Sequence, residues 1–190
     1  MKNRILSIFA AIAVTLSLSA CQNSNTEQTA PQTIQLSEET TSTEIQYVTD
    51  WSIDELVQNI ELNGKTYSMP FTLDDLGAEY SLGEKVSLPD DRYGYNLNYN
   101  GEYFALIVIN DELEVSKSPI TILTIVDNTN YRCGELYYGN SKTAVQDVYG
   151  KPSYENSLKN INSYSFKNGS GVTITYENDK LVGVTIRYYN

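Results

Sequence analysis

Apolar residues recur at helical spacing in one part of this chain and at every second position in others. These two spacings predict where helices and strands form. In the last third, apolar residues recur at helical spacing, which predicts a short helix over residues 141–149. Asn140 or Ser141 can cap its first turn by accepting hydrogen bonds from backbone N–H groups. Gly150 suits the residue that follows a helix, and Pro152 prevents its continuation. We expect its apolar side to be buried, namely Ala144, Val145, Val148 and Tyr149.

Three segments after this helix alternate between apolar and polar residues, which is typical of half-buried β-strands. Three-residue loops at 168–170 and 178–180 predict an antiparallel sheet. The expected cross-strand pairs are Phe166–Val172, Tyr164–Ile174, Tyr176–Val182 and Ile174–Val184. One face would pack on the helix, which predicts the α+β class. The other face would meet water and carries Ser163, Ser165, Thr173, Thr175, Thr185 and Arg187.

Two Asn-Gly pairs flanked by alternating residues predict β-hairpins before the helix. The first turn, at residues 63–64, would pair Ile60 with Tyr67. The second turn, at residues 100–101, would join two strands that share an apolar face of Tyr93, Tyr95, Leu97, Phe104, Leu106 and Val108. The remaining expected elements are helical turns at 52–58 and 72–77, a loop at 83–92, a strand at 120–126 and an extended segment at 133–138.

The predicted helix and the strands after it also carry a family resemblance. The residues that carry it are Gly139, Ser141, Val145, Gly150 and Pro152, followed by three strands. This pattern resembles the SmpA/OmlA (BamE-like) lipoprotein module over residues 135–190, and it is similar to the repeat unit of the β-lactamase-inhibitor-protein fold. Members of both groups act by binding other proteins. The resemblance therefore implies an extracytoplasmic, non-enzymatic role.

The first residues have the pattern of an export signal. Lys2 and Arg4 precede an apolar run over residues 5–18, and Leu-Ser-Ala then leads to Cys21. The run is too short to span the ~30 Å of hydrocarbon in a bilayer. The cysteine resembles that of the bacterial lipobox, whose thiol receives a diacylglyceryl group. We expect residues 1–20 to be a lipoprotein signal peptide and Cys21 to be the lipid attachment site, since two acyl chains anchor stably.

The composition changes again after the cysteine. Residues 22–46 are mainly Gln, Thr, Ser and Glu and cannot form a core, so we expect 21–46 to be a lipidated, disordered tether. Residues 47–190 would form a single α+β domain, hairpin-rich over 47–138 and with the helix and three strands over 139–190. The expected location is the cell membrane, facing outside the cytoplasm. Abundant Asn, Ile, Lys and Tyr favour a monoderm host, where this is the outer leaflet of the plasma membrane.

The charge of the chain and the residue types that it lacks exclude several classes of partner and of catalytic site. Without residues 1–20 the chain keeps 11 basic and 24 acidic residues, a formal charge of −13, which disfavours nucleic acid as a partner. There is no histidine, which excludes Ser-His-Asp and Cys-His catalysis and the common catalytic zinc sites. No cofactor or metal is indicated. With Cys21 acylated, Cys133 is the remaining thiol, either buried as a small apolar residue or reactive.

The chain contains sixteen tyrosines, but only one tryptophan and four phenylalanines. Tyrosine suits recognition surfaces, because it combines a large contact area with a polar tip. We expect Tyr93, Tyr95, Tyr164 and Tyr176 in or beside the core. Six others lie near the helix and the chain end and form the candidate binding surface: Tyr137, Tyr138, Tyr149, Tyr154, Tyr188 and Tyr189.

The leading hypothesis is therefore a lipoprotein that binds a protein or a cell-envelope component, without catalysis. One alternative is a lipoprotein that binds a small molecule or a glycan. Another is a carboxylate-dependent envelope hydrolase, whose acids would come from Asp74, Asp75, Asp90 and Asp91.

Overall fold

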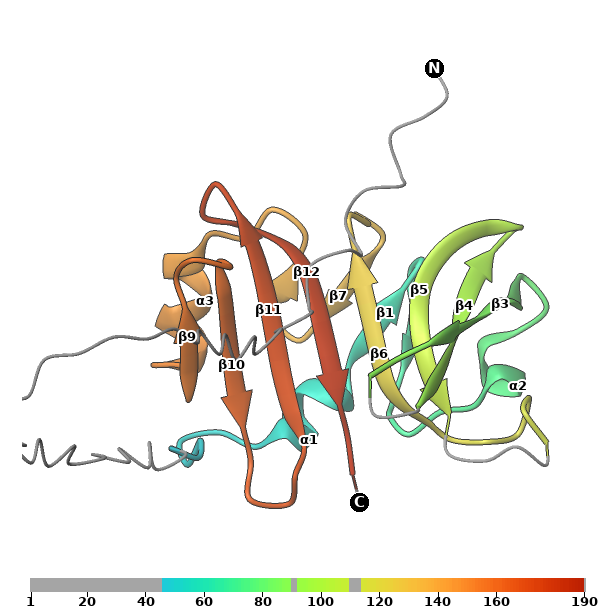
Figure 1. The fold of residues 1–190 in the computed structure, drawn as a ribbon, viewed down its shortest axis with the longest axis horizontal. Coiled ribbons are helices and arrows are strands. Elements are labelled where there is room, and N and C mark those ends of the chain that lie inside the picture. Colours follow the sequence, from blue (N-terminus) through green and yellow to red (C-terminus); the bar gives the residue numbers. More distant parts are fainter. Residues whose placement is uncertain (1–45, 90–91, 110–113, 190) are drawn as a thin grey trace, which may run out of the picture. The chain divides into compact units, whose positions relative to one another are not determined.

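Two antiparallel sheets form the framework of residues 46–89, 92–109 and 114–189, the part of the chain that the computed structural model describes. In spatial order the eight-stranded sheet contains β3 (Tyr80–Ser87), β4 (Tyr93–Tyr99), β5 (Glu102–Ile109), β6 (Ile120–Val126), β12 (Lys180–Arg187), β11 (Gly171–Glu177), β10 (Ile161–Ser165) and β9 (Tyr154–Asn156) (Figure 1). The four-stranded sheet contains β2 (Lys65–Tyr67), β1 (Ile60–Leu62), β7 (Tyr131–Cys133) and β8 (Leu136–Tyr137). The chain is thus α+β with mainly antiparallel strands. The predicted signal peptide, Cys21 and the tether up to residue 45 lie outside the described residues.

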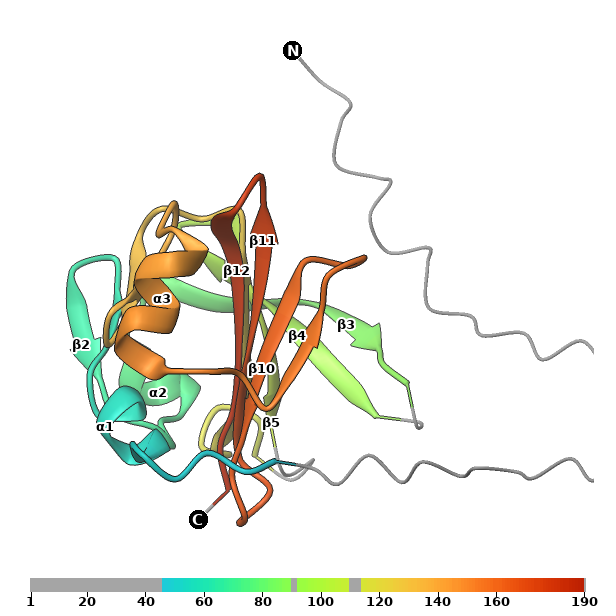
Figure 2. The ribbon, with the colours of Figure 1, turned by 90° about the vertical axis from the view of Figure 1, so that its left-hand side faces the viewer.

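Three short helices lie on the same side of the large sheet as β2 (Figure 2). They are α1 (Ile53–Val57), α2 (Leu73–Leu76) and α3 (Lys142–Tyr149), at the three predicted places. Ser52 caps α1, Thr72 and Asp75 form a capping box on α2, and the Ser141 side chain accepts from the Ala144 N–H at 3.1 Å. In the described part of the chain, no helix is long and apolar enough to cross a bilayer.

Aromatic rings connect α3 with the C-terminal strands. The Tyr149 and Tyr164 ring centroids are 6.3 Å apart, and the Tyr164 hydroxyl donates to the Gly150 carbonyl at 3.2 Å. The Trp51 ring lies 4.8 Å from Tyr149 and 4.9 Å from Phe166, and its indole N–H donates to the Tyr149 carbonyl. The end of α3 is therefore held by edge-to-face and tilted ring contacts.

The first hairpin has the predicted register, with Ile60 opposite Tyr67. The second is predicted correctly only near its turn. The register shifts between Leu97 and Asn98, where Phe104 is the extra residue on β5, so that Leu97 faces Ala105, and both Phe104 and Ala105 are buried. The extra residue shifts every later pair by one position. Tyr93, predicted on the apolar face, is 49% exposed, and the Lys85 Nζ lies 4.2 Å from its ring centroid.

The C-terminal strands keep the predicted faces but not all the predicted pairs. Tyr164 faces Val172 rather than Ile174, a two-residue shift that leaves both side chains buried. Ile174 faces Val184 as predicted. Tyr176 faces Leu181 rather than Val182, because the turn has two residues, 178 and 179, both with positive φ, and a bulge follows it.

The outer face of these strands carries a row of hydroxyl groups rather than only solvated side chains. Ser163 and Thr173 are 3.1 Å apart, and so are Thr124 and Thr185, each as a cross-strand hydrogen bond between half-buried residues. The three helices lie on the opposite face (Figure 2).

Residues 83–87 belong to strand β3, so the predicted loop over 83–92 is wrong for that part. β3 is an edge strand whose exposed polar residues hide its backbone pairing with β4, and a bulge between Leu82 and Lys85 breaks the alternation. The segment 133–138 also differs from the prediction: β7 and β8 pair around a turn at Gly134, so it is not one extended piece.

The predicted burial of the apolar side of α3 holds for Val145 but fails for Val148. Val145 is 1% exposed and Val148 is 55% exposed, since only the side of the short helix next to Val145 meets other elements. Ala144 and Tyr149 are half-buried.

Replacing each valine with alanine tests this asymmetry. Val145→Ala should lower the free energy of unfolding by roughly 2 kcal/mol, because it leaves a cavity in the core. Val148→Ala, the matched control in the same helix, should change it by less than about 0.5 kcal/mol. Urea unfolding followed by circular dichroism measures both, and equal losses would contradict the packing described here.

Candidate functional site

An open cleft of about 570 Å³ lies at the outer face of the small sheet. Three parts of the chain line it: the β1–β2 hairpin, the end of β4 and the segment from residue 129 through β7 to β8. The lining residues are Glu61, Asn63, Gly64, Tyr99, Thr129, Asn130, Tyr131, Arg132 and Tyr137. A concave site in which polar and aromatic groups from distant segments converge is typical of ligand binding.

Hydrogen bonds fix the rim of this cleft. The Asn63 N–H donates to the Asn130 carbonyl at 2.8 Å, and its side-chain amide donates to the Tyr80 hydroxyl at 2.8 Å. The Asn130 N–H donates to the Asn128 side chain at 2.8 Å, an Asx turn that shapes the loop before β7. Asn63 and Gly64 both have positive φ, as the tight hairpin requires. The rim is therefore held in place by backbone as well as side-chain contacts.

One acid and one base face each other across the floor of the cleft. Glu61 on β1 and Arg132 on β7 are directly opposite cross-strand partners. Arg132 is engaged elsewhere, since its Nε donates to the Gly134 carbonyl at 2.8 Å and its Nη2 to Glu135 at 2.7 Å. Among the described residues, none gives the Glu61 carboxylate a hydrogen bond or an ion pair. An acceptor is thus left open to a ligand.

The three tyrosines of the cleft differ in exposure. Tyr137 is 43% exposed, and the Arg132 guanidinium lies 5.8 Å from its ring centroid. Tyr99 is half-buried, with its ring 5.0 Å from that of Tyr80. Tyr131 is 4% exposed, and its hydroxyl has no hydrogen-bond partner among the described residues. Burial raises the pKa of the Tyr131 hydroxyl. Along β7, Tyr131 and Cys133 are buried and Arg132 between them is exposed, so the Tyr131 hydroxyl lies on the core side of the strand and is not open to the cleft.

A second hollow of about 220 Å³ lies between α1, α3 and the turn at Gly134. Its lining residues are Trp51, Glu55, Leu56, Gly134, Glu135, Val148 and Tyr149. The Tyr149 hydroxyl accepts from the Glu135 N–H at 2.9 Å and would lie 2.8 Å from a Cβ at residue 134, which has φ 58°. Gly134 is therefore required where the tyrosine tip meets the turn.

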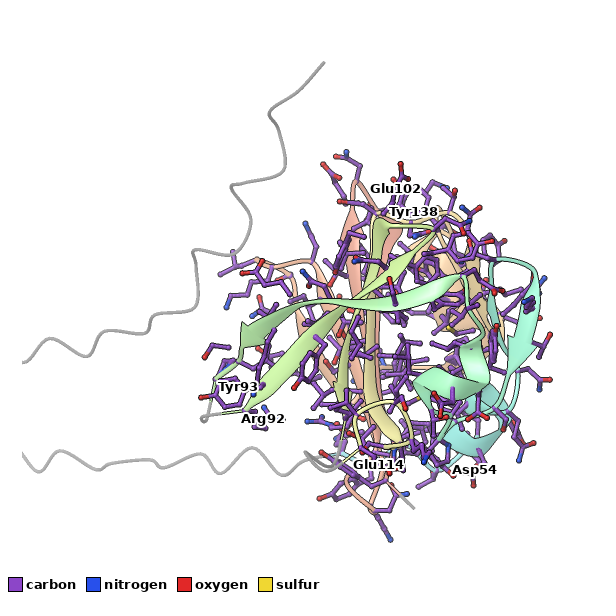
Figure 3. All side chains as sticks on the ribbon, turned by 90° about the vertical axis from the view of Figure 1, so that its right-hand side faces the viewer. Asp54, Arg92, Tyr93, Glu102, Glu114 and Tyr138 are labelled. Atoms are coloured by element: carbon purple, nitrogen blue, oxygen red, sulfur yellow. The ribbon has the colours of Figure 1, made fainter. Side chains whose placement is uncertain are left out.

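The six tyrosines of the predicted surface do not gather in one place. Tyr137 lines the cleft, while Tyr149 lines the second hollow. Tyr154 is 57% exposed on the edge strand β9. The Tyr188 hydroxyl donates to Asp54 at 2.9 Å, and Figure 3 shows Asp54 and Tyr138 at opposite ends of the molecule. Tyr189, after β12, donates its N–H to the Ser170 hydroxyl.

Sequence reasoning missed most of the cleft. Glu61 and Arg132 look like ordinary exposed charges, Tyr131 has no motif around it, and Tyr99 looks like the last strand residue before the Asn100-Gly101 turn. The sequence feature that does point to the cleft is the Asn-Gly turn at residues 63–64, because this turn forms part of the rim.

Two of the acids considered for hydrolysis can be placed. The Asp75 carboxylate accepts from the Thr72 N–H and hydroxyl, both at 2.8 Å, and these bonds lower its pKa. A lowered pKa opposes a role as a general acid. Asp74 is exposed beside it, whereas Asp90 and Asp91 lie outside the described residues. The described residues also contain no group of three or more acidic, histidine or cysteine side chains suited to a metal ion.

Neither a family model, nor a curated protein, nor a solved structure matches this chain.

Cys133 lies in β7 behind this cleft and is buried, which settles the two alternatives in favour of a packed apolar residue. Burial raises the pKa of its thiol to about 12. A thiol is reactive as the thiolate, so the folded protein should protect it.

Two measurements test the state of Cys133. Ellman's reagent should label it in urea and leave it unlabelled in native buffer. Because its pKa is raised on folding, its contribution to stability is full below the unfolded pKa near 8.5 and is lost as pH rises toward 12. The free energy of unfolding should therefore fall less between pH 8 and pH 10.5 in Cys133→Ala than in the wild type. Rapid native labelling would contradict the burial.

Proposed function

We propose that this chain is a lipoprotein anchored to the cell membrane through Cys21, and that its α+β domain binds a protein or another envelope component outside the cytoplasm. The Leu-Ser-Ala-Cys sequence after a short apolar run supports the anchor. The resemblance of residues 135–190 to BamE-like modules supports a binding role. In this proposal α3 packs on β10–β12 as one unit, and the other strands extend it.

The observation that carries the binding role is the cleft at the small sheet. It combines an exposed aromatic ring, Tyr137, with an open acceptor, Glu61. The rim is fixed by hydrogen bonds, so binding orders few additional groups. Contact with a partner accounts for these features without a catalytic residue.

Changing the anchor residue tests the location. Cys21→Ala should abolish incorporation of labelled palmitate and move the protein from the membrane fraction to the soluble fraction or the medium, because the acyl chains are lost. Cys133→Ala is the matched control, since it removes the chain's other cysteine and should leave fractionation unchanged. Membrane retention of Cys21→Ala without palmitate would contradict the anchor.

Site-specific photo-crosslinking tests the binding role. A photoreactive phenylalanine at position 137 should give an envelope-derived adduct on intact cells, because this ring lines the cleft. The same group at position 154, another exposed tyrosine on a different sheet, should give less of that adduct. Equal adducts from both positions, or none from either, would count against the cleft as the contact site.

A further inference from the structure

The smaller hollow, between α1, α3 and the turn at Gly134, is lined by apolar and acidic side chains. We propose that it is a docking site for a basic segment of a partner protein, which inserts one apolar side chain beside Trp51 and Val148 and places a lysine or arginine next to Glu55. This inference rests on the proposed function, because it names the chemistry of a protein partner and adds a second contact beside the cleft.

The size of the hollow suits one side chain rather than a whole small molecule. Its volume of about 220 Å³ is below the range of roughly 300–1,000 Å³ that is usual for small-molecule sites. The residues that dominate protein interfaces, in contrast, are often single side chains that fill a pocket of the partner. The hollow therefore matches a side chain that another protein presents.

Apolar groups supply the contact area in the hollow. Its aromatic and aliphatic lining residues are Trp51, Leu56, Val148 and Tyr149. Val148 is 55% exposed, and Trp51 is half-buried. Covering these side chains removes apolar surface from water, which favours association. A single exposed valine needs no explanation, but this one shares a concave site with an indole ring.

The charges of the hollow favour a basic partner. The two charged residues that line it, Glu55 and Glu135, are both acids. Glu135 is paired with Arg132 at 2.7 Å, whereas no described residue gives the Glu55 carboxylate a hydrogen bond or an ion pair. One unpaired negative charge is thus left beside the apolar groups. The chain as a whole is also acidic, which steers a cationic partner toward it and repels an anionic one.

Contacts within the chain fix the walls of the hollow. The indole N–H of Trp51 donates to the Tyr149 carbonyl at 3.0 Å, and the centroids of the two rings are 4.8 Å apart. The Tyr149 hydroxyl accepts from the Glu135 N–H at 2.9 Å, which joins α3 to the turn after β7. Binding therefore orders few additional groups.

The hollow also adjoins the larger cleft. Arg132 lines the cleft, Glu135 lines the hollow, and their ion pair at 2.7 Å connects the two sites. Both sites thus meet at the turn between β7 and β8, where one protein partner can contact both.

The fluorescence of Trp51 tests this inference, because the chain contains no other tryptophan and this one lines the hollow. The full-length lipidated protein in dodecyl maltoside micelles is titrated with three peptides that lack aromatic residues: Lys-Lys-Leu-Lys-Lys, Lys-Lys-Ser-Lys-Lys and Glu-Glu-Leu-Glu-Glu. The basic leucine peptide should shift the emission to shorter wavelength and protect Trp51 from quenching by acrylamide, because its apolar side chain displaces water from the indole. The serine peptide and the acidic peptide should each bind at least about tenfold more weakly.

Variants of the hollow separate its two kinds of contact. Val148→Ala should weaken binding of the basic leucine peptide by about fivefold or more, and Glu55→Gln by about threefold, because they remove an apolar contact and an exposed ion pair. Glu102→Gln is the matched control, since it removes the same charge from an exposed position on β5 and should leave the affinity unchanged. Figure 3 shows Glu102 at the opposite end of the molecule from Asp54 of α1. All three side chains are exposed, so melting temperatures close to the wild type should separate binding from folding.

Three results would overturn the inference. These are an unchanged Trp51 emission with the basic leucine peptide at up to about 10 mM, an equal affinity for the serine or the acidic peptide, or an unchanged affinity in the Val148→Ala variant. If photo-crosslinking from position 137 gives its adduct while the basic leucine peptide fails, the docking assignment falls and the proposed binding role stands. If Cys21→Ala remains anchored, the proposed function fails whatever the titration gives.

Discussion

The pairing of β6 with β12 holds this structure together, because it joins strands that lie far apart in the sequence. On one side are the hairpin strands β3 to β6, and on the other β9 to β12. Val184 faces Ile125 and Ile186 faces Leu123, and all four side chains are at most 1% exposed. Without this pairing, β6 and β12 would become open edges and the core between the halves would be exposed.

The strands of the β6–β12 pairing also position the segments that line the cleft. Just beyond β6, the Asp127 N–H donates to the Val182 carbonyl at 2.8 Å, and the segment that follows carries Thr129 and Asn130 of the rim. Gly139, after β8, donates to the Leu181 carbonyl at 2.8 Å. β12 therefore positions both ends of the segment that contains β7 and β8, and the geometry of the cleft depends on a strand that contributes no lining residue to it.

The elements that could be predicted from sequence are those determined by interactions between residues close together in the chain. Ser52, Thr72 and Ser141 mark helix starts because their side chains replace missing backbone partners, and Asn-Gly marks turns because these residues accept positive φ. Pairing across the chain was not predictable in this way. The bulge at Phe104 and the edge strand β3 depend on neighbours that come from elsewhere in the sequence, and Val148 is exposed because no element covers it.

The cleft was harder to predict than the fold for a related reason. An exposed tyrosine has no local signature that distinguishes a binding residue from a solvated one, so proximity to the helix grouped six tyrosines that the fold separates. Glu61 differs from other exposed acids only because it lies opposite Arg132 while the Arg132 guanidinium is bound to Glu135, and the sequence alone shows neither contact.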